Sequence, residues 1–208
     1  MRVRSVRTVA LAAVIAGAGA GHAAPKRSCN LVVDPAGDVR NTVNGVPVPN
    51  DPGLDLLGGD IATNAEFVTA VIRLATEPEP PTVYARTYLV QVNAGLRRPL
   101  ILAFDIGVDG TRYSWGYADS TVYNYRGRAT GRFDGRTAHI TARLADIAAD
   151  ESLGAIKAGA TMKGISLFSF RRVTSHTGVH GFVFSADDAF GKPSATYRAG
   201  APSCIKVG

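Results

Sequence analysis

Aspartates that could hold a metal ion gather in two short glycine-containing stretches. The stretch "LVVDPAGDV" carries Asp34 and Asp38, and "LDLLGGDIA" carries Asp55 and Asp60. Calcium binds six to eight oxygens, which carboxylates and backbone carbonyls of adjacent loops can supply. The Pro-Ala-Gly turn of the first stretch could fold its two aspartates around one cation, and Asp187 in "FSADDAF" could approach from the C-terminal end. The pattern predicts a calcium site formed or bordered by these five residues.

Two alternative roles for these aspartates stay open. Aspartate beside proline or glycine commonly forms turns without any ligand. A secreted hydrolase could instead use Asp34, Asp60 or a histidine, but nothing in the sequence places two carboxylates across a sugar-binding cleft. The chain also lacks the G-x-S-x-G, H-E-x-x-H, P-loop and Rossmann motifs. We therefore expect a protein that is not an enzyme.

An aromatic stripe in "RYSWGY" is the candidate ligand-binding feature. Tyr113, Trp115 and Tyr117 alternate along the chain, and a strand places alternate residues on one face. An exposed stripe could stack on sugar rings. The opposite face carries the small residues Ser114 and Gly116, which favours the alternative that the aromatic face packs in the core. We expect Trp115 to be at least half buried.

The first 24 residues resemble a secretory signal peptide. Three arginines precede a short apolar run that ends in small residues. The run is too short and too rich in glycine for a membrane span, and we expect none in the mature chain. Cleavage removes three of the 23 basic residues and none of the 17 acidic ones, so the net charge falls from +6 to +3. The remaining excess is ordinary, which argues against a nucleic-acid partner.

The two cysteines, Cys29 and Cys204, lie near opposite ends of the mature chain. An even number of cysteines in an exported protein favours a disulfide. The termini of compact domains often lie close together, so this pairing is geometrically reasonable. We expect the two residues to be bridged.

Residues 25–208 are predicted to form a single domain, an antiparallel β-sandwich. Short apolar or alternating runs recur between turn signals, as in "AEFVTAVIRLAT" (65–76), where every second residue is apolar. Asp109-Gly110 predicts a hairpin with a type I′ turn, and a second hairpin is expected around Asp134-Gly135. Helix is expected only as a turn or two within residues 144–159.

The order of several short motifs resembles a group of exported bacterial β-sandwich proteins. The motifs are "VVDPAGDV", "LDLLGGDIA", "VTAVIRLAT", "GRFDGRTAHITARLADI", "LGAIKAGATMKGI" and "APSC". The group is similar to family-nine-type carbohydrate-binding modules and to dopamine-monooxygenase-N-terminal-like domains. The resemblance implies a jelly-roll-like or immunoglobulin-like sandwich with an Asp-Gly-Asp loop, in some members calcium-bearing.

Members of this group bind sugars, haem or no known ligand. Haem is not expected here, because Met162 is the only methionine of the mature chain and no histidine lies close to it in sequence. We expect a secreted, non-catalytic sandwich that binds glycan or a cell-envelope surface. A secreted hydrolase and a structural or interaction protein without a small ligand are the alternatives.

Overall fold

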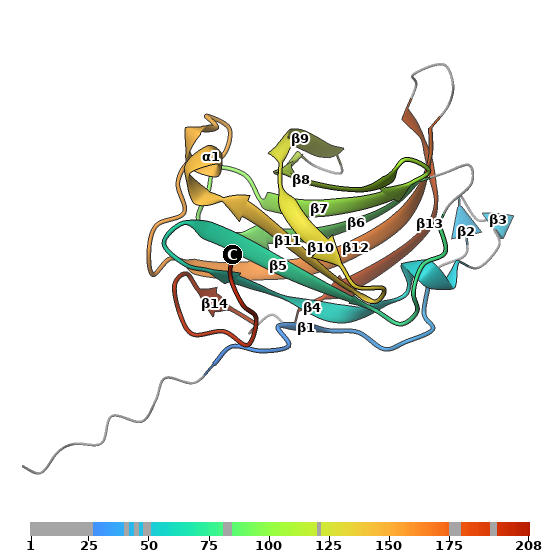
Figure 1. The fold of residues 1–208 in the computed structure, drawn as a ribbon, viewed down its shortest axis with the longest axis horizontal. Helices are drawn as coiled ribbons and strands as arrows, with labels where there is room; N and C mark the ends of the chain where they lie inside the picture. The colour runs from blue at the N-terminus through green and yellow to red at the C-terminus, as the bar shows by residue number, and fades with distance from the viewer. Residues whose placement is uncertain are drawn as a thin grey trace, which may run out of the picture.

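Two antiparallel sheets face each other across one core, as the ribbon in Figure 1 shows. The computed structural model describes residues 27–39, 42–43, 46–47, 51–80, 85–119, 122–174, 180–191 and 195–208. The predicted signal peptide (1–24) lies outside these residues. The all-β sandwich predicted from the sequence is confirmed.

The first sheet has five strands in the order β1-β4-β5-β11-β10. Their bounds are β1 (Val32–Val33), β4 (Leu56–Thr63), β5 (Phe67–Leu74), β11 (Thr137–Arg143) and β10 (Thr130–Phe133). Each neighbouring pair is antiparallel. Four strands of the second sheet lie between β5 and β10 in the chain, and the rest of that sheet follows β11.

The second sheet has the order β13-β12-β6-β7-β8-β9, and β14 pairs with β12 beside this path. Its strands are β6 (Ala85–Asn93), β7 (Leu100–Gly107), β8 (Gly110–Asp119), β9 (Val122–Arg128), β12 (Thr161–Thr174), β13 (His180–Phe190) and β14 (Tyr197–Arg198). Two further short strands, β2 (Thr42–Val43) and β3 (Val46–Pro47), pair with each other.

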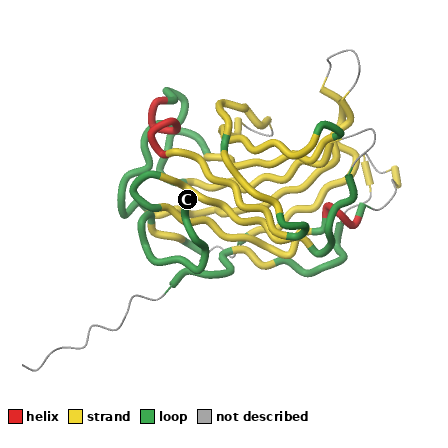
Figure 2. Tube along the Cα trace, in the orientation of Figure 1, coloured by secondary structure: helices red, strands yellow, loops and turns green. Residues whose placement is uncertain are grey.

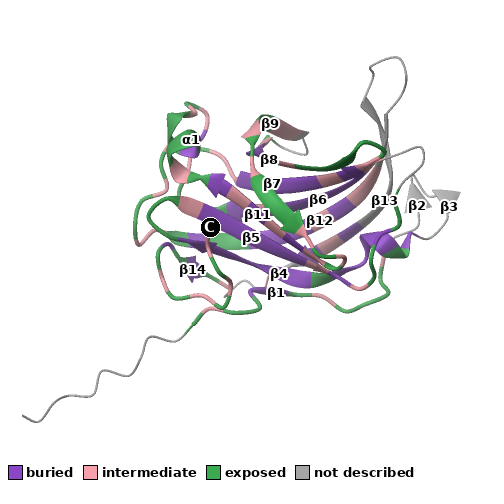
Figure 3. Cartoon of the chain, in the orientation of Figure 1, coloured by how far each residue is buried: buried purple, intermediate pink, exposed green. Residues whose placement is uncertain are grey.

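The core lies between the two sheets because apolar residues alternate along the strands. On β5 the buried, inward residues are Val68, Ala70, Ile72 and Leu74, as the sequence pattern predicts. On β11 they are Ala138, Ile140 and Ala142. Figure 3 shows β5 as a mostly buried ribbon and β11 as a ribbon of alternating buried and intermediate residues.

Helix is confined to two short segments among the described residues, which Figure 2 shows in red. They are the 3-10 turn η1 (Pro52–Leu54) and the helix α1 (Leu144–Ala149), which falls where helix was expected. In the described part of the chain, no helix is both long and apolar enough to cross a membrane.

The hairpin between β7 and β8 is confirmed, but its turn differs from the predicted one. Gly107 pairs with Gly110, so Val108 and Asp109 form the loop. Gly110 has a φ of +100°, whereas Asp109 does not have a positive φ. A type I′ turn needs positive φ at both central residues. The predicted type I′ turn at Asp109-Gly110 is therefore wrong, and the glycine serves the first position of β8.

The hairpin between β10 and β11 lies where Asp134-Gly135 predicts it. The backbone N–H of Asp134 donates to the carbonyl of Thr137 at 3.1 Å, and the Asp134 carboxylate accepts from the N–H of Thr137 at 3.0 Å. Gly135 has a φ of +87°, in the region that glycine adopts at no steric cost.

Cys29 and Cys204 form a disulfide with a Cα–Cα distance of 5.2 Å, which confirms the predicted pairing. The backbone N–H of Cys204 also donates to the carbonyl of Ser28 at 3.1 Å, and Ser28 forms a parallel bridge with Ser203. The first and last described segments of the chain therefore run side by side.

Candidate metal centre

Three aspartates from two distant parts of the chain meet where β1 and β13, edge strands of the two sheets, lie close together. We call Asp34, Asp38 and Asp187 the acidic cluster, because a carboxylate oxygen of each lies within 4.8 Å of the others. Asp34 directly follows β1, which belongs to the first sheet, whereas Asp187 lies on β13 of the second. A cation held here would connect the two sheets.

Backbone hydrogen bonds place the loop that carries Asp34 and Asp38. The N–H of Asp34 donates to the carbonyl of Leu57 at 3.1 Å, which continues the pairing of β1 with β4. Gly58 of β4 has a φ of +131°, and a Cβ there would lie 2.2 Å from the carbonyl oxygen of Val32. Only glycine permits this close approach. The glycine pair of "LLGGD" therefore brings the aspartate loop against β4.

Asp187 is fixed from the opposite side. It is buried, and its Oδ2 accepts the backbone N–H of Leu56 at 2.7 Å. Its Oδ1 accepts the N–H of Asp188 at 2.9 Å. Ser169, its partner on β12, donates to the carbonyl of Leu54 at 2.5 Å. These bonds hold the carboxylate against the segment that joins η1 to β4.

Asp55 lies next to the acidic cluster and contacts the loop that carries Asp34 and Asp38. It is 7% exposed, and its Oδ2 accepts the N–H of Gly37 at 2.8 Å. Its negative charge raises the pKa of both Asp34 and Asp187, so it lies near both carboxyl groups. The predicted residues Asp34, Asp38, Asp55 and Asp187 are thus brought together by the fold.

Two oxygens of this group lack hydrogen-bond partners. Within the described part of the chain, Asp34 Oδ2 and Asp55 Oδ1 are buried and unpartnered. Buried polar atoms are nearly always bonded, and an unsatisfied one costs about 1–3 kcal/mol. Both atoms are carboxylate oxygens, which are the ligands that hard cations prefer. This feature distinguishes the group from ordinary turn-forming aspartates.

Electrostatics in the cluster favour a proton or a cation. Burial raises the pKa of Asp34 to about 7, and the charges of Asp187, Asp38, Asp55 and Asp188 contribute to the rise in that order. Burial also raises the pKa of Asp187, against the lowering effect of its backbone hydrogen bonds. Carboxylates that repel one another in a partly buried site are stabilised when a positive charge is added.

The acidic cluster predicts an unusual pH dependence of stability without calcium. The pKa of Asp34 rises from 3.8 in the unfolded chain to about 7, so between these values the folded state keeps a proton that the unfolded chain releases. This contribution is present below about pH 4 and is lost as the pH rises through about 7. In EDTA, the melting temperature of the wild type relative to Asp34→Asn should therefore fall over this interval. A difference that rises over the same interval would contradict the assignment.

Asp60 was predicted as a metal ligand, but the structure places it elsewhere. It lies in the middle of β4, where its Oδ1 accepts the N–H of Leu31 at 2.9 Å and its Oδ2 pairs with the guanidinium of Arg73. It is not a member of the acidic cluster. Asp60 holds the segment before β1 onto the sheet, and its charge is already balanced by an arginine.

The aromatic stripe packs in the core, so it is not an exposed ligand platform. Trp115 and Tyr117 are each 6% exposed, which confirms the burial expected of Trp115. Tyr113 is half-buried and stacks on Phe104 at 6.2 Å between ring centroids. The inward side chains of β8 fill the space between the two sheets, so large residues are found there. The packing alternative is therefore correct, and the ligand-binding assignment of these three residues is not supported.

Comparisons of the sequence and the structure with known proteins found no relative. The chain matches no protein-family model, no curated protein and no solved structure.

Proposed function

We propose that the protein is an exported, non-catalytic β-sandwich that binds one calcium ion and presents a glycan-binding surface. The ion would be held by Asp34, Asp38, Asp55 and Asp187. The single observation that carries the calcium proposal is the pair of buried, unpartnered carboxylate oxygens beside the acidic cluster, within the described part of the chain.

Calcium fits this donor set better than other common cations. All four side chains offer oxygen, whereas zinc prefers nitrogen and sulfur ligands. Magnesium requires near-ideal octahedral geometry and keeps several waters, whereas calcium accepts irregular arrangements of carboxylates. The exposed side chain of Asp38 leaves one side of the cluster open, so water can complete the coordination.

The role that we assign to calcium is a clamp between the two sheets. The loop after β1 carries two of the ligands, and β13 carries Asp187. Without an ion, folding forces these like charges together; with an ion, the same charges attract a common partner. The surface-binding part of the proposal has separate support, namely the signal-like N-terminus and the resemblance to carbohydrate-binding sandwiches.

Calcium is expected to raise the melting temperature relative to EDTA. A ligand that binds only the folded state stabilises it by about 2.7 kcal/mol at a hundredfold excess over Kd. The measurement is a thermal melt of the mature protein in calcium, in magnesium and in EDTA. Asp38→Asn should reduce the shift, because the exposed Asp38 contributes charge to the cluster without supporting the core.

The matched control is Asp134→Asn in the hairpin between β10 and β11. Asparagine keeps the side-chain oxygen that accepts from Thr137, so this variant removes one charge without removing the turn. It should show the full calcium shift. Identical wild-type melting curves in calcium and EDTA would leave the aspartates as turn formers only.

A hydrolase is the second candidate function, favoured by the raised pKa of Asp34. A carboxyl group that keeps its proton near neutral pH beside an ionised carboxylate is the arrangement of many general acids. This candidate requires glycosidase activity that Asp34→Asn abolishes and that calcium inhibits, since the ion would displace the proton. The calcium proposal predicts no such activity.

A further inference from the structure

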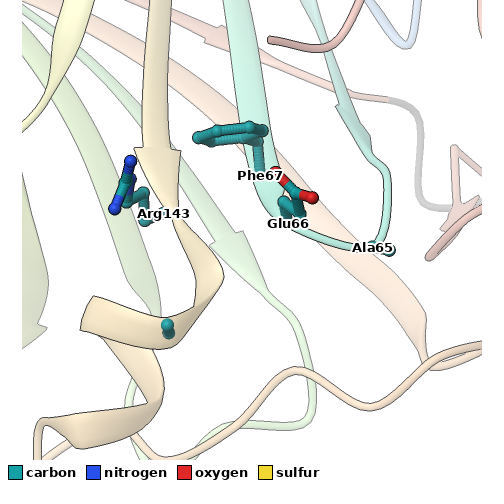
Figure 4. Close-up of a pocket in the computed structure, with 5 residues that line it drawn as sticks. Ala65, Glu66, Phe67 and Arg143 are labelled. Atoms are coloured by element: carbon teal, nitrogen blue, oxygen red, sulfur yellow. The ribbon is translucent and has the colours of Figure 1, made fainter.

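Two neighbouring pockets lie along the outer face of the five-stranded sheet. The first has a volume of about 310 Å³ and is lined by Glu66, Phe67 and Arg143 among others. Figure 4 shows Phe67 and Arg143 projecting side by side from adjacent strands, with Glu66 next to them. The second has a volume of about 340 Å³, and its polar lining is Thr69, Thr130, Arg132, His139, Thr141 and Lys206.

Strand register shows that the two pockets lie end to end. Phe67 pairs with Arg143. The next pair on the same face is Thr69 with Thr141, about 7 Å further along the strands. On the other side of β11, Thr141 pairs with Thr130. The intervening residues point into the core, so both pockets open on the same outer face of the sheet.

We call the part of this face that carries Arg132, Arg143 and Lys206 the basic strip; Glu66 lines the first pocket beside Arg143. Among the described residues, Arg132, Arg143 and Lys206 form no ion pair with a carboxylate, whereas Arg73 on the same sheet is paired with Asp60. Arg132 Nη2 lies 3.3 Å from His139 Nε2, so the histidine can accept from the guanidinium and orient it.

Hydroxyl groups lie between these cations. Thr69 Oγ1 and Thr141 Oγ1 are 2.9 Å apart, and the N–H of Gly208 donates to Thr69 Oγ1 at 3.4 Å. The C-terminal segment thus crosses the sheet and brings Lys206 to the second pocket. The disulfide at Cys204 fixes the start of this segment, so the position of the lysine is built into the fold.

We propose that the basic strip binds an anionic glycan, a saccharide chain that carries carboxylate or sulfate groups. This inference rests on the proposed glycan-binding function and names its ligand class and site. Arginine recognises planar or tetrahedral oxyanions through paired N–H donors. Arg132 pairs with His139, four residues along β11 from Arg143, so the two arginines can contact separate acidic groups of one chain. The hydroxyls of Thr130, which is exposed, and Thr141, which is half-buried, supply neutral partners for sugar hydroxyls. The half-buried ring of Phe67 supplies an apolar face for a sugar ring.

The test is isothermal titration of the mature protein with three oligosaccharides of equal length. One is sulfated, one is an oligogalacturonate, and one is a neutral maltooligosaccharide. We expect binding of at least one acidic chain and none of the neutral one. The double variant Arg132→Gln/Arg143→Gln should raise the Kd of the acidic oligosaccharide about tenfold or more. This change corresponds to the loss of about one charge-assisted hydrogen bond. Preference between the first two probes distinguishes sulfate from carboxylate.

The matched control is Arg112→Gln/Arg128→Gln, which removes the same charge from exposed positions on the second sheet. It should bind as the wild type does. The proposal would be overturned if both double variants lost the same affinity for the acidic oligosaccharide, or if the wild type bound duplex DNA equally tightly. Either result would mean that the basic strip attracts any polyanion. Competition by free sulfate at the concentration of the oligosaccharide would also overturn it.

The calcium and glycan results can be separated. Titrations in calcium and in EDTA are run below the melting temperature, where the sheet of the basic strip is folded in both. Loss of the calcium melting shift with acidic-chain binding intact contradicts only the metal site. Binding of the neutral chain alone contradicts the basic strip but not glycan binding, and no glycan binding at all contradicts both.

Discussion

Replacing both Cys29 and Cys204 with serine is expected to lower the free energy of unfolding by up to about 5 kcal/mol. The bridge spans 175 residues. On the chain-entropy model, a crosslink stabilises by restricting the unfolded chain, and the effect grows with the logarithm of the loop length. Domains of this kind are stable by only about 5–15 kcal/mol, so the variant should be near the limit of folding. Urea denaturation of the two proteins in calcium measures the loss.

Reduction of the wild type supplies the control for this prediction. Dithiothreitol should bring the wild type to the stability of the serine variant and should leave the variant itself unchanged. A loss below about 1 kcal/mol would show that the crosslink hardly restricts the unfolded state. The hydrogen bonds between residues 28 and 202–204 would then hold the ends together unaided.

Arg86→Met is expected to destabilise the fold by about 3–5 kcal/mol. Arg86 and Asp51 form a buried ion pair, with Nε donating to Oδ2 at 2.9 Å. Removing the cation leaves the carboxylate of Asp51 buried and uncompensated, which is far more costly than the pair is favourable. The same carboxylate caps η1 by accepting the N–H of Gly53 at 3.2 Å, so its displacement would loosen the turn that leads to Asp55.

The double variant Asp51→Asn/Arg86→Met separates a charge effect from a packing effect. Removing both charges should recover part of the loss, because no uncompensated ion remains. Arg98→Met is the matched control, since Arg98 pairs with Asp119 on the surface and such pairs contribute about 0–1 kcal/mol. A loss of similar size for Arg86→Met and Arg98→Met, measured by urea denaturation, would contradict a burial-dependent charge effect.

The strands could be predicted because their evidence is local. Alternation along residues 65–76 places Val68, Ala70 and Ile72 on one face, and the structure buries all three. The turn at residues 107–110 was harder, since Asp109-Gly110 has the composition of a type I′ turn while the pairing of Gly107 decides the loop. That pairing depends on the register of two long strands, which the dipeptide alone does not determine.

The acidic site could be predicted only in part for a similar reason. Asp34 and Asp38 share one short loop, so their proximity is visible in the sequence. Asp60 has the same local composition, but its partner Arg73 lies on the next strand and neutralises it. The sequence carries a signal for this pair, because the alternation of β4 and β5 places both residues on the outer face. The proximity of Asp187 to Asp34 and Asp38 is visible only in the three-dimensional fold, because Asp187 lies far from them in the sequence.

The basic strip was not predicted, although half of it is visible in the sequence. In "TAHITAR" the outward positions hold Thr137, His139, Thr141 and Arg143. The contribution of Lys206 could not be found in this way, because it comes from a segment that crosses the sheet rather than from a strand.

The covalent junction of the chain ends determines how the domain would respond to mechanical load. Tension applied through segments outside Cys29 and Cys204 would pass directly across the sulfur–sulfur bond. The chain between the two cysteines, which contains both sheets, would carry almost none of it. A load applied through such flanking segments would therefore leave the strands paired, as long as the bridge stays oxidised.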